Sequence, residues 1–471
     1  MSNSHITINN AQMKAGGAAG RVRAFLLDNI VTVIFVVFLL VGYFASPGIT
    51  ASSLISEVLT RFFRNGLLVV SLIIPVMAGL GLNFGIVIGA IAAVLSLILV
   101  RYHGGAGFGG LMLAFLISLP LALLFGFLAG KLYNRTRGQE MIASLIVGYF
   151  AEGLLLIFVL YVIGGVIPVD AEHKMIIPTT DGAPGVGVRA TFDMGQHPSL
   201  LSQRVAEEPG MKYAMDFLWR VEFLHAFLAL SVGMLGVTAF RYVRSRRNPA
   251  LQDLSKLSFG LRCGVWGLLA LLCLHGMLLP NGVVFHFSGF SLRIPGSFLT
   301  GVGMIPMVTG LVLLGFCLLT TFFTKTKLGQ DCRAVGQNQH IAKVSGINVD
   351  RTRIIATMIS TVLAAWGMII FLQEVGTVST YTHHRMIGMF SVAALLVGGA
   401  TAAKANVKNA MIGLLLFHSM FVVSPGIGRM ISDNEGVGEY TRSFMVYAVI
   451  GLSLGLYVWK ARKAEKDRDT M

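Results

Sequence analysis

Residues 83–100 read NFGIVIGAIAAVLSLILV, a stretch in which no side chain carries a charge. A helix needs about 20 predominantly apolar residues to cross the roughly 30 Å hydrocarbon core of a bilayer. The preceding residues 66–82 are just as apolar and join this stretch without a loop. The two runs therefore predict helices that cross or enter a membrane, with the polar side chain of Asn83 at their junction.

The same kind of run recurs along the whole chain of 471 residues, of which 55% are hydrophobic and 13% charged. Soluble proteins carry about 25% charged residues. Apolar runs lie near residues 28–45, 66–82, 83–100, 107–130, 141–166, 221–240, 262–280, 302–323, 354–373, 386–402, 409–424 and 441–459. We expect an all-α, polytopic membrane protein with about ten to twelve transmembrane helices. Some are expected to be broken or re-entrant, which lipid tolerates only where other protein covers the freed backbone.

The surplus of positive charge, +15 overall, has two explanations. Clustered Lys and Arg could bind the phosphates of a nucleic acid, or they could mark the cytoplasmic side of a membrane protein. With the N-terminus inside and the runs alternating, most of the 37 Lys and Arg residues fall on the inner side. The positive-inside rule therefore places both termini in the cytoplasm, and no nucleic acid partner is expected.

This map divides the chain into five parts. They are a cytoplasmic N-terminal segment (1–27), a first membrane half (28–166), an external loop or small cap (167–220), a second membrane half (221–459) that includes a cytoplasmic loop (324–353), and a cytoplasmic tail (460–471). The external loop is rich in proline and in charges of both signs. It either contacts an external partner or acts as a spacer.

Small and polar residues within the runs are candidates for packing and for a solute pathway. Gly81, Gly85 and Gly89 are spaced four apart, which predicts one helical face that another helix can approach closely. Asn83, Glu152 and His418 are the candidate polar residues of a substrate pathway. An acid at the centre of a membrane helix costs about 2.5–3.5 kcal/mol on insertion scales. Glu152 is therefore expected either to pair with a neighbouring helix or to line the pathway.

Enzymatic and metal motifs do not fit the chain. The glycines of GAGFGG at 105–110 match a dinucleotide pattern, but no strand precedes them. The four cysteines show neither a CxxC pair nor a Cys/His spacing suited to a metal. No nucleophile or paired-carboxylate arrangement is present either. We expect no catalytic residues, no metal and no cofactor bound by this chain.

The cytoplasmic loop carries the most specific signal. Residues 325–349 read KTKLGQDCRAVGQNQHIAKVSGINV. The pattern predicts a short polar helix at 330–335 that is broken at Gly336, and a second short helix at 339–344 that is ended by Gly346. Two short helices with glycine hinges are suited to docking against another protein, although a plain solvated loop is the alternative.

This loop resembles the cytoplasmic signature of permease subunits of ATP-binding-cassette (ABC) importers that carry branched-chain amino acids, simple sugars and nucleosides. The matching elements are Gly329, the RAVG of 333–336, Asn338, Ala342, the GINV of 346–349 and Arg351. The resemblance is close from 325 to 370. The hydrophobic organisation of most of the remaining chain, including LLVGGATAAKANVKNAMIG at 395–413, is also similar to the family.

The resemblance implies the role of this loop and its partners. It implies that the loop couples the chain to a separate ABC ATPase subunit, which uses ATP and Mg, through Gly329, Arg333, Ala334, Gly336, Gln337, Asn338 and Gly346. It further implies a periplasmic or lipid-anchored solute-binding protein, a second permease copy or paralogue, and a place in the bacterial inner membrane. The chain itself would be no enzyme and would work by alternating access.

The sequence indicates the class of the substrate. Residues 137–150, RGQEMIASLIVGYF, look more like the nucleoside branch of the family. In sugar-type and nucleoside-type members an acidic residue commonly lies in the segment that corresponds to Asn83 and its followers, and this chain has no acid there. A simple sugar or a nucleoside is expected. The alternatives are an ion-gradient-driven secondary transporter or channel, which would need more ionisable residues in its helices, and a structural membrane scaffold.

Overall fold

The computed structural model describes residues 30–44, 46, 49–170, 172–178, 185–195, 210–247, 256–278, 283–287, 290–294, 301–431, 436–448, 450–452 and 455. The predicted cytoplasmic segment 1–27 and tail 460–471 lie outside these residues. So do parts of the predicted external loop 167–220.

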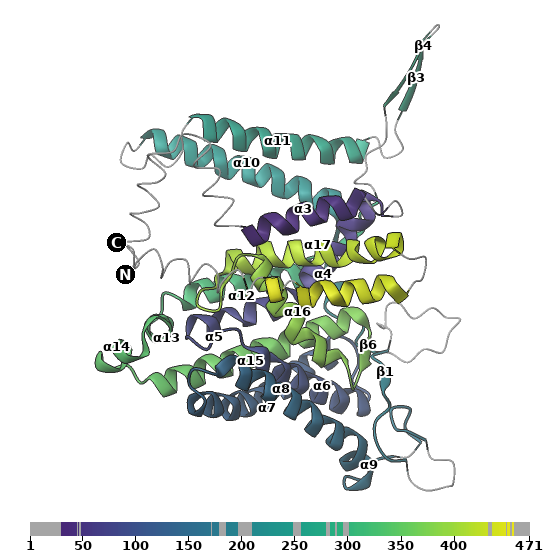
Figure 1. Cartoon of the computed structure of the whole chain (residues 1–471). Coiled ribbons are helices and arrows are strands. Elements are labelled where there is room, and N and C mark those ends of the chain that lie inside the picture. Colours follow the sequence, from purple (N-terminus) through teal and green to yellow (C-terminus); the bar gives the residue numbers. More distant parts are fainter. Residues whose placement is uncertain are drawn as a thin grey trace. The chain divides into compact units, whose positions relative to one another are not determined.

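Helices make up most of the described chain (Figure 1). Their bounds are α3 (Ile30–Phe44), α4 (Ala51–Ser71), α5 (Ile73–Met77), the 3-10 helix η1 (Phe84–Ile86), α6 (Val87–Tyr102), α7 (Gly107–Arg135), α8 (Glu140–Ile157), the π-helix η2 (Phe158–Val162), α9 (Ile163–Gly165), the 3-10 helix η4 (Asp216–Leu218), α10 (Phe223–Arg247), α11 (Lys256–Leu278), α12 (Met307–Phe323), α13 (Lys327–Gln337), α14 (Gln339–Val344), α15 (Val349–Val375), α16 (His383–Val397) and α17 (Val407–Ile431).

Short antiparallel strand pairs are the other regular elements. They are β1 (Thr191–Asp193) with β6 (Thr377–Ser379), β2 (Arg220–Glu222) with β5 (Met304–Pro306), and β3 (Val283–Phe287) with β4 (Phe290–Ile294). The first pair joins part of the predicted external loop to the residues that follow α15.

Eight helices in the described part of the chain are long and apolar enough to cross a membrane. They are Ala51–Met77, Phe84–Tyr102, Gly107–Arg135, Glu140–Gly165, Phe223–Ser245, Phe259–Leu278, Val349–Val375 and Val407–Arg429. A ninth span results if α12 and α13, bent by 72°, count as one, and Thr32–Phe44 and His383–Val397 are shorter apolar helices. The predicted all-α, polytopic membrane fold is confirmed.

The first of these spans begins earlier than the apolar run at 66–82 indicated. The helix starts at Ala51 and contains Arg64, which lies two residues before the predicted run. Nη1 of Arg64 lies 2.5 Å from Oε2 of Glu374 on α15, and its guanidinium lies over the ring of Phe371. A partner far along the chain thus neutralises a charge that looked incompatible with a buried helix.

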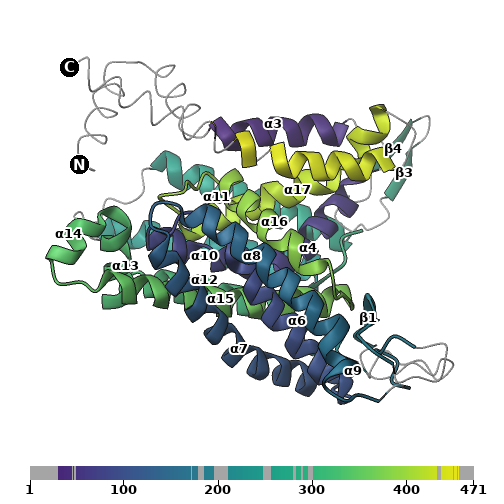
Figure 2. The ribbon, with the colours of Figure 1, turned by 60° about the horizontal axis from the view of Figure 1, so that its bottom comes forward.

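The helices form two compact units, of which the first consists of Met1–Pro47, Arg61–Met215 and Leu311–Met471. Within it, α15 lies against α6 and α7, and α6 also contacts α8 (Figure 2). A second group in the same unit consists of α3, α16 and α17, with α17 in contact with both others. Helices from both predicted membrane halves therefore share one core. The second unit, Gly48–Thr60 with Asp216–Gly310, contains the paired helices α10 and α11.

The expectation that Gly81, Gly85 and Gly89 share one helical face is wrong. The chain leaves the helix after α5, so Gly81 lies in a turn with a φ of +70°, Gly85 lies in η1, and Gly89 lies in α6. Each glycine packs against a different element. A Cβ at Gly89 would lie 2.9 Å from Cβ of Ala364 on α15, and one at Gly81 would lie 3.0 Å from Cγ of Met141 on α8.

Small residues on α7 allow its close approach to α15. A Cβ at Gly126 would lie 2.8 Å from Cα of Met358, and one at Gly130 would lie 2.9 Å from Cα of Ile354. Between membrane helices, where lipid removes the hydrophobic driving force, such close packing supplies much of the attraction. The contact of α7 with α15 therefore depends on these two glycines.

We predict that Gly130→Ala destabilises the protein whereas Gly153→Ala does not. A Cβ at Gly153 of α8 meets no atom within 4 Å, so alanine there gains helix propensity worth up to about 1 kcal/mol. At Gly130 the added methyl group meets backbone, and overpacking costs about 1–3 kcal/mol. Thermal unfolding in detergent would measure both. Equal melting temperatures for the two variants would contradict the packing described.

Candidate functional site

The segment that contains α13 and α14, residues 324–348 (the α13–α14 segment), is built from three successive helix starts. Oγ1 of Thr326 accepts a hydrogen bond from the amide of Gly329 at 3.2 Å and caps α13. Oδ1 of Asn338 accepts from the amide of Ile341 at 3.0 Å and caps α14. Oδ1 of Asn348 accepts from the amide of Arg351 at 3.0 Å and caps α15. N-caps of this kind are typically worth about 0.5–2 kcal/mol each.

The predicted break at Gly336 is wrong, because α13 continues through this residue to Gln337 and ends at Asn338. Gly336 instead lies against the turn after α5, where a Cβ would collide with the carbonyl oxygen of Met77. Gly79 in that turn has a φ of +75°, and a Cβ there would lie 2.8 Å from Cα of Gly336. The glycine therefore serves a close approach between α13 and α5.

The predicted second helix at 339–344 and its end at Gly346 are confirmed. Gly346 has a φ of +82°, which favours glycine. The amide of Gly346 donates to the carbonyl of Lys343 at 3.1 Å, and the amide of Ile347 donates to the carbonyl of Ala342 at 3.0 Å. These two bonds form a Schellman motif, which satisfies carbonyl groups at the helix end.

One side of the α13–α14 segment is buried and the other is exposed. Val335, Ala342 and Val349 form a buried cluster with the partly buried Ala334 and Ile347 packed against it. Gly329 is buried at the bend after α12, where a Cβ would collide with the carbonyl oxygen of Phe323. The exposed side carries Arg333, Gln337, Asn338, Ile341 and Val344, of which Ile341 is 62% and Val344 is 76% exposed. These two aliphatic side chains are therefore available for contact with another molecule.

The thiol of Cys332 is buried where α13 packs against its neighbours. Cys332 is fully buried, and burial, together with the neighbouring Asp331, raises the pKa of its thiol to about 12. The thiol therefore stays protonated at neutral pH. It is a packing residue and not a reactive one.

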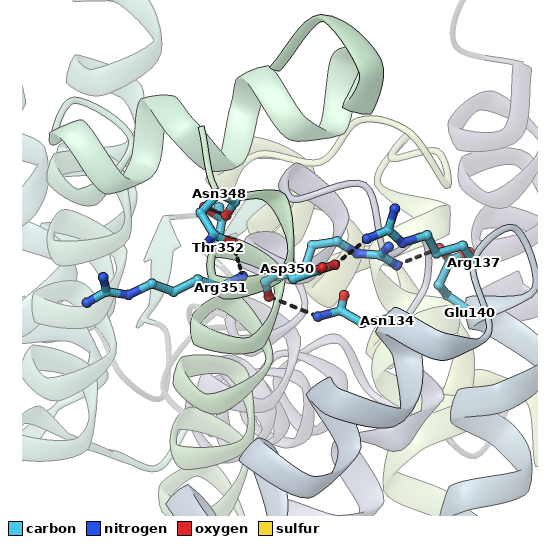
Figure 3. Close-up of polar contacts among 8 residues, drawn as sticks. Asn134, Arg137, Glu140, Asn348, Asp350, Arg351 and Thr352 are labelled. Carbon is cyan, nitrogen blue, oxygen red and sulfur yellow. Dashed lines mark hydrogen bonds and ion pairs between the residues drawn. The ribbon is translucent and has the colours of Figure 1, made fainter. Parts of the chain in front are cut away.

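Polar residues at the end of α7, in the turn that follows and at the start of α8 bind the start of α15 (Figure 3). Nη2 of Arg353 lies 2.5 Å from Oε1 of Glu140, and Arg353 is fully buried while the Glu140 side chain is 12% exposed. Arg137 forms a second, exposed ion pair with the carboxylate of Asp350. Nδ2 of Asn134 donates to the backbone carbonyl of Asp350 at 2.9 Å. We call these contacts the α8–α15 latch.

The sequence did not single out this latch. Arg353 had been assigned to the loop that ends at residue 353, but α15 begins at Val349, so Arg353 lies within the helix. A signal was present in the basic residues Arg351 and Arg353 directly before an uninterrupted apolar run. The matching acid, Glu140, lies 213 positions away and could not be assigned from spacing.

Comparisons with known proteins show which proteins the chain is similar to. Residues 257–456 match the family described as "Branched-chain amino acid transport system / permease component". The chain is 31% identical over 134 residues to the high-affinity branched-chain amino acid transport system permease protein LivH of Escherichia coli K12, a match that covers 28% of this chain and 40% of LivH.

Two further relatives carry other solutes. The galactose/methyl galactoside import permease protein MglC of Escherichia coli K12 is 28% identical over 173 residues, covering 36% of this chain and 48% of MglC. The nucleoside ABC transporter permease protein NupB of Lactococcus lactis is 25% identical over 176 residues, covering 36% of this chain and 44% of NupB. The resemblance to ABC importer permeases is confirmed. The chain matches less than half the length of each of these permeases, and no solved structure matches it.

Two of the candidate pathway residues, Asn83 and Glu152, have partners within the protein. Oδ1 of the buried Asn83 accepts from the amide of Gly85 at 3.0 Å and caps η1. Glu152 on α8 is 4% exposed, and its Oε1 accepts from Nε of Arg385 on α16 at 2.8 Å. Of the two alternatives for Glu152, pairing with a neighbouring helix is observed.

The position of Glu152 is nevertheless compatible with a pathway. A cavity of about 60 Å³ is lined by Phe84, Tyr149, Glu152, Arg385 and Tyr447, among others. The Arg385 side chain is 54% exposed, so the arginine end of the ion pair is accessible from outside the protein. Arg385 was not among the predicted residues, because it precedes the apolar run by a single residue and resembled a loop charge.

His418 belongs to a different cluster. It is 3% exposed on α17, and its ring centroid lies 5.2 Å from that of Phe417 and 6.3 Å from that of Phe421. Its Nδ1 has no hydrogen-bond partner in the described part of the chain. The structure therefore places Glu152 beside the η1 segment that Asn83 caps, while His418 lies among aromatic side chains of α17. No group of three or more His, Cys, Asp or Glu residues among the described residues could hold a metal.

We predict that Glu140→Gln lowers the stability of the protein far more than Asp350→Asn. Removing one partner of a buried ion pair typically costs about 3–5 kcal/mol, since the other charge remains buried. An exposed pair is worth only about 0–1 kcal/mol. Chemical denaturation in detergent would compare the two variants.

A double variant that removes both charges of the buried pair is the matched control. The double variant Glu140→Leu/Arg353→Met removes both charges together, which is often neutral or stabilising. Its stability should exceed that of Glu140→Gln. Similar losses for Glu140→Gln and Asp350→Asn, or a double variant less stable than Glu140→Gln, would contradict the buried pairing.

Proposed function

We propose that the chain is the transmembrane permease subunit of an ATP-driven ABC importer. The observation that carries this proposal is the α13–α14 segment, a pair of capped helices that exposes polar and aliphatic side chains on one side and continues directly into the long helix α15. Such a segment can receive a partner's movement at one end and deliver it to a membrane helix at the other.

The partner at this segment is a separate ABC ATPase subunit. Ile341 and Val344 supply the apolar contact, and Arg333, Gln337 and Asn338 supply polar contacts around it. Gly329, Ala334 and Gly336 pack the segment against its neighbouring elements, and Gly346, with its positive φ, ends α14 and shapes the turn into α15. ATP and Mg belong to the ATPase, and this chain is expected to bind no cofactor and to be no enzyme.

The latch gives a route for movement from the segment into the membrane. When the ATPases close, the α13–α14 segment moves with the start of α15, and the pairing of Arg353 with Glu140 carries α8 along. Because α15 also packs on α6 and α7, a large part of the first unit would move as one body. Access to a pathway would then alternate between the two sides, as in rigid-body transitions of other proteins.

The remaining partners and the location follow from the same proposal. A periplasmic or lipid-anchored binding protein delivers the solute outside, and a second permease copy or paralogue completes the membrane part. The protein would lie in the bacterial inner membrane with both termini in the cytoplasm. The solute would be small and polar, with a simple sugar or a nucleoside favoured. The galactose permease and the nucleoside permease among the relatives support these two solute classes. Because a branched-chain amino acid permease is also a relative, an amino acid is included among the solutes to be tested.

We predict that Ile341→Asp/Val344→Asp abolishes both the association with the ATPase and ATP-driven uptake. Two carboxylates in place of exposed aliphatic side chains would lose the apolar contact without disturbing the fold, since both side chains point away from the core. The measurements are co-purification of the ATPase and uptake of labelled galactose, adenosine and leucine into vesicles that contain the complex.

Val186→Asp is the matched control. Val186 is also exposed, at 38%, but it lies in the predicted external loop. This variant should retain the ATPase and the uptake. Normal uptake by the Ile341→Asp/Val344→Asp variant would contradict the proposal. Uptake driven by an ion gradient without ATP would establish a secondary transporter instead.

A further inference from the structure

A basic cavity lies beside the α13–α14 segment in the first unit. It has a volume of about 730 Å³ and is enclosed by the ends of α5 and α12, by α13, and by residues 403–408 at the start of α17. Its polar lining includes the side chains of Arg333, Lys404, Lys408 and Gln337. Arg333 and Gln337, which the proposed function places at the ATPase contact, lie at the border of this cavity, whereas Lys404 and Lys408 have no role in the proposed transport mechanism.

The charges in the cavity are unbalanced. Three cations converge on it, and no Asp or Glu is present among the described residues of its lining. Arg333, Lys404 and Lys408 also have no ion-pair partner elsewhere in the described part of the chain. Like charges in one concavity repel, so the arrangement favours a bound anion. Arg and Lys are the residues that proteins use to bind phosphate groups.

Exposed apolar side chains continue from the cavity along the two helices that border it. On α17, Lys408, Ile412 and Leu415 follow at a spacing of four and three residues, which places them on one face. On α12, Leu314, Leu318 and Thr321 follow at the same spacing, and Thr321 lines the cavity. The two leucines of α12 are 54% and 61% exposed, and Ile412 and Leu415 are 48% and 46% exposed.

We propose that this cavity binds the phosphate headgroup of an anionic phospholipid, with the acyl chains lying along α12 and α17. A cationic cavity at the end of two exposed apolar helix faces matches an amphiphile with a phosphate at one end, whereas a free anion would need only the cavity. Basic pockets between transmembrane helices on the cytoplasmic side are suited to such headgroups. The site rests on the membrane location of the chain and not on its transport function.

The site places a lipid in direct contact with α13. Arg333, Gly336 and Gln337 of that helix line the cavity. A bound phosphate would offset the repulsion among Arg333, Lys404 and Lys408. It would thereby hold α13 beside the start of α17, so that the lipid becomes part of the surface on which the α13–α14 segment rests.

The test is a lipid titration of the purified full chain, followed by native mass spectrometry, with phosphatidylglycerol, phosphatidylcholine and inorganic phosphate as probes. Phosphatidylglycerol should bind most tightly. Each lysine near a membrane surface contributes about 1 kcal/mol of attraction to anionic lipid, so Lys404→Ala and Lys408→Ala should each weaken the binding of phosphatidylglycerol about fivefold. Lys408→Arg should retain it, which would show that the charge and not the fold is responsible.

The double variant Lys327→Ala/Lys343→Ala is the matched control. It removes two positive charges, as many as Lys404→Ala/Lys408→Ala, from exposed lysines of α13 and α14 that do not line the cavity, so the affinity for phosphatidylglycerol should not change. Equal weakening by this control would reduce the effect to net charge and overturn the site. Equal binding of phosphatidylcholine, or equal binding of inorganic phosphate, would also overturn it. So would loss of the ATPase without loss of lipid in Lys404→Ala/Lys408→Ala, since a protein partner would then occupy the cavity.

Discussion

The pairing of the buried Arg353 with Glu140 is the interaction on which the arrangement of the first unit depends. A guanidinium that is fully buried in the first turns of α15 is stable only where an acid meets it, because an unpaired buried charge is very costly. That requirement fixes the start of α15 against the start of α8. The close approaches of α7 and α6 to α15 at their glycines then set the rest of the helix packing.

This constraint connects the membrane part to the α13–α14 segment. Because α15 begins at Val349, only the turn at 345–348 separates it from α14. The three caps at Thr326, Asn338 and Asn348 make each helix start at a defined residue. The α13–α14 segment therefore consists of short helices with defined ends, and its buried side packs against the membrane helices. Its helix α13 also forms one wall of the basic cavity, so the lipid and the ATPase would both contact α13, with Arg333 and Gln337 at the border between the two sites.

Features with a local cause could be predicted from the sequence. The apolar runs indicated the helices, and the second short helix with its end at Gly346 followed from turn chemistry within a few residues. Features with a distant cause could not. Gly336 resembles a helix breaker until α5 is seen packed against it, and Arg64 resembles a loop charge until Glu374 is seen beside it. Glu152 was rightly singled out as an acid that needs an explanation, but its partner Arg385 lies 233 positions away.

The latch requires the α13–α14 segment and the turn between α7 and α8 to move as one body. Spin labels at Lys325, before α13, and at Arg135, at the end of α7, would measure the distance between the two elements by pulsed electron spin resonance. Both side chains are exposed and lie outside the latch. In the complex with its ATPase, we expect the same distance distribution without nucleotide and with ATP bound, while uptake shows that the complex cycles. A distance that changes with the nucleotide would contradict it.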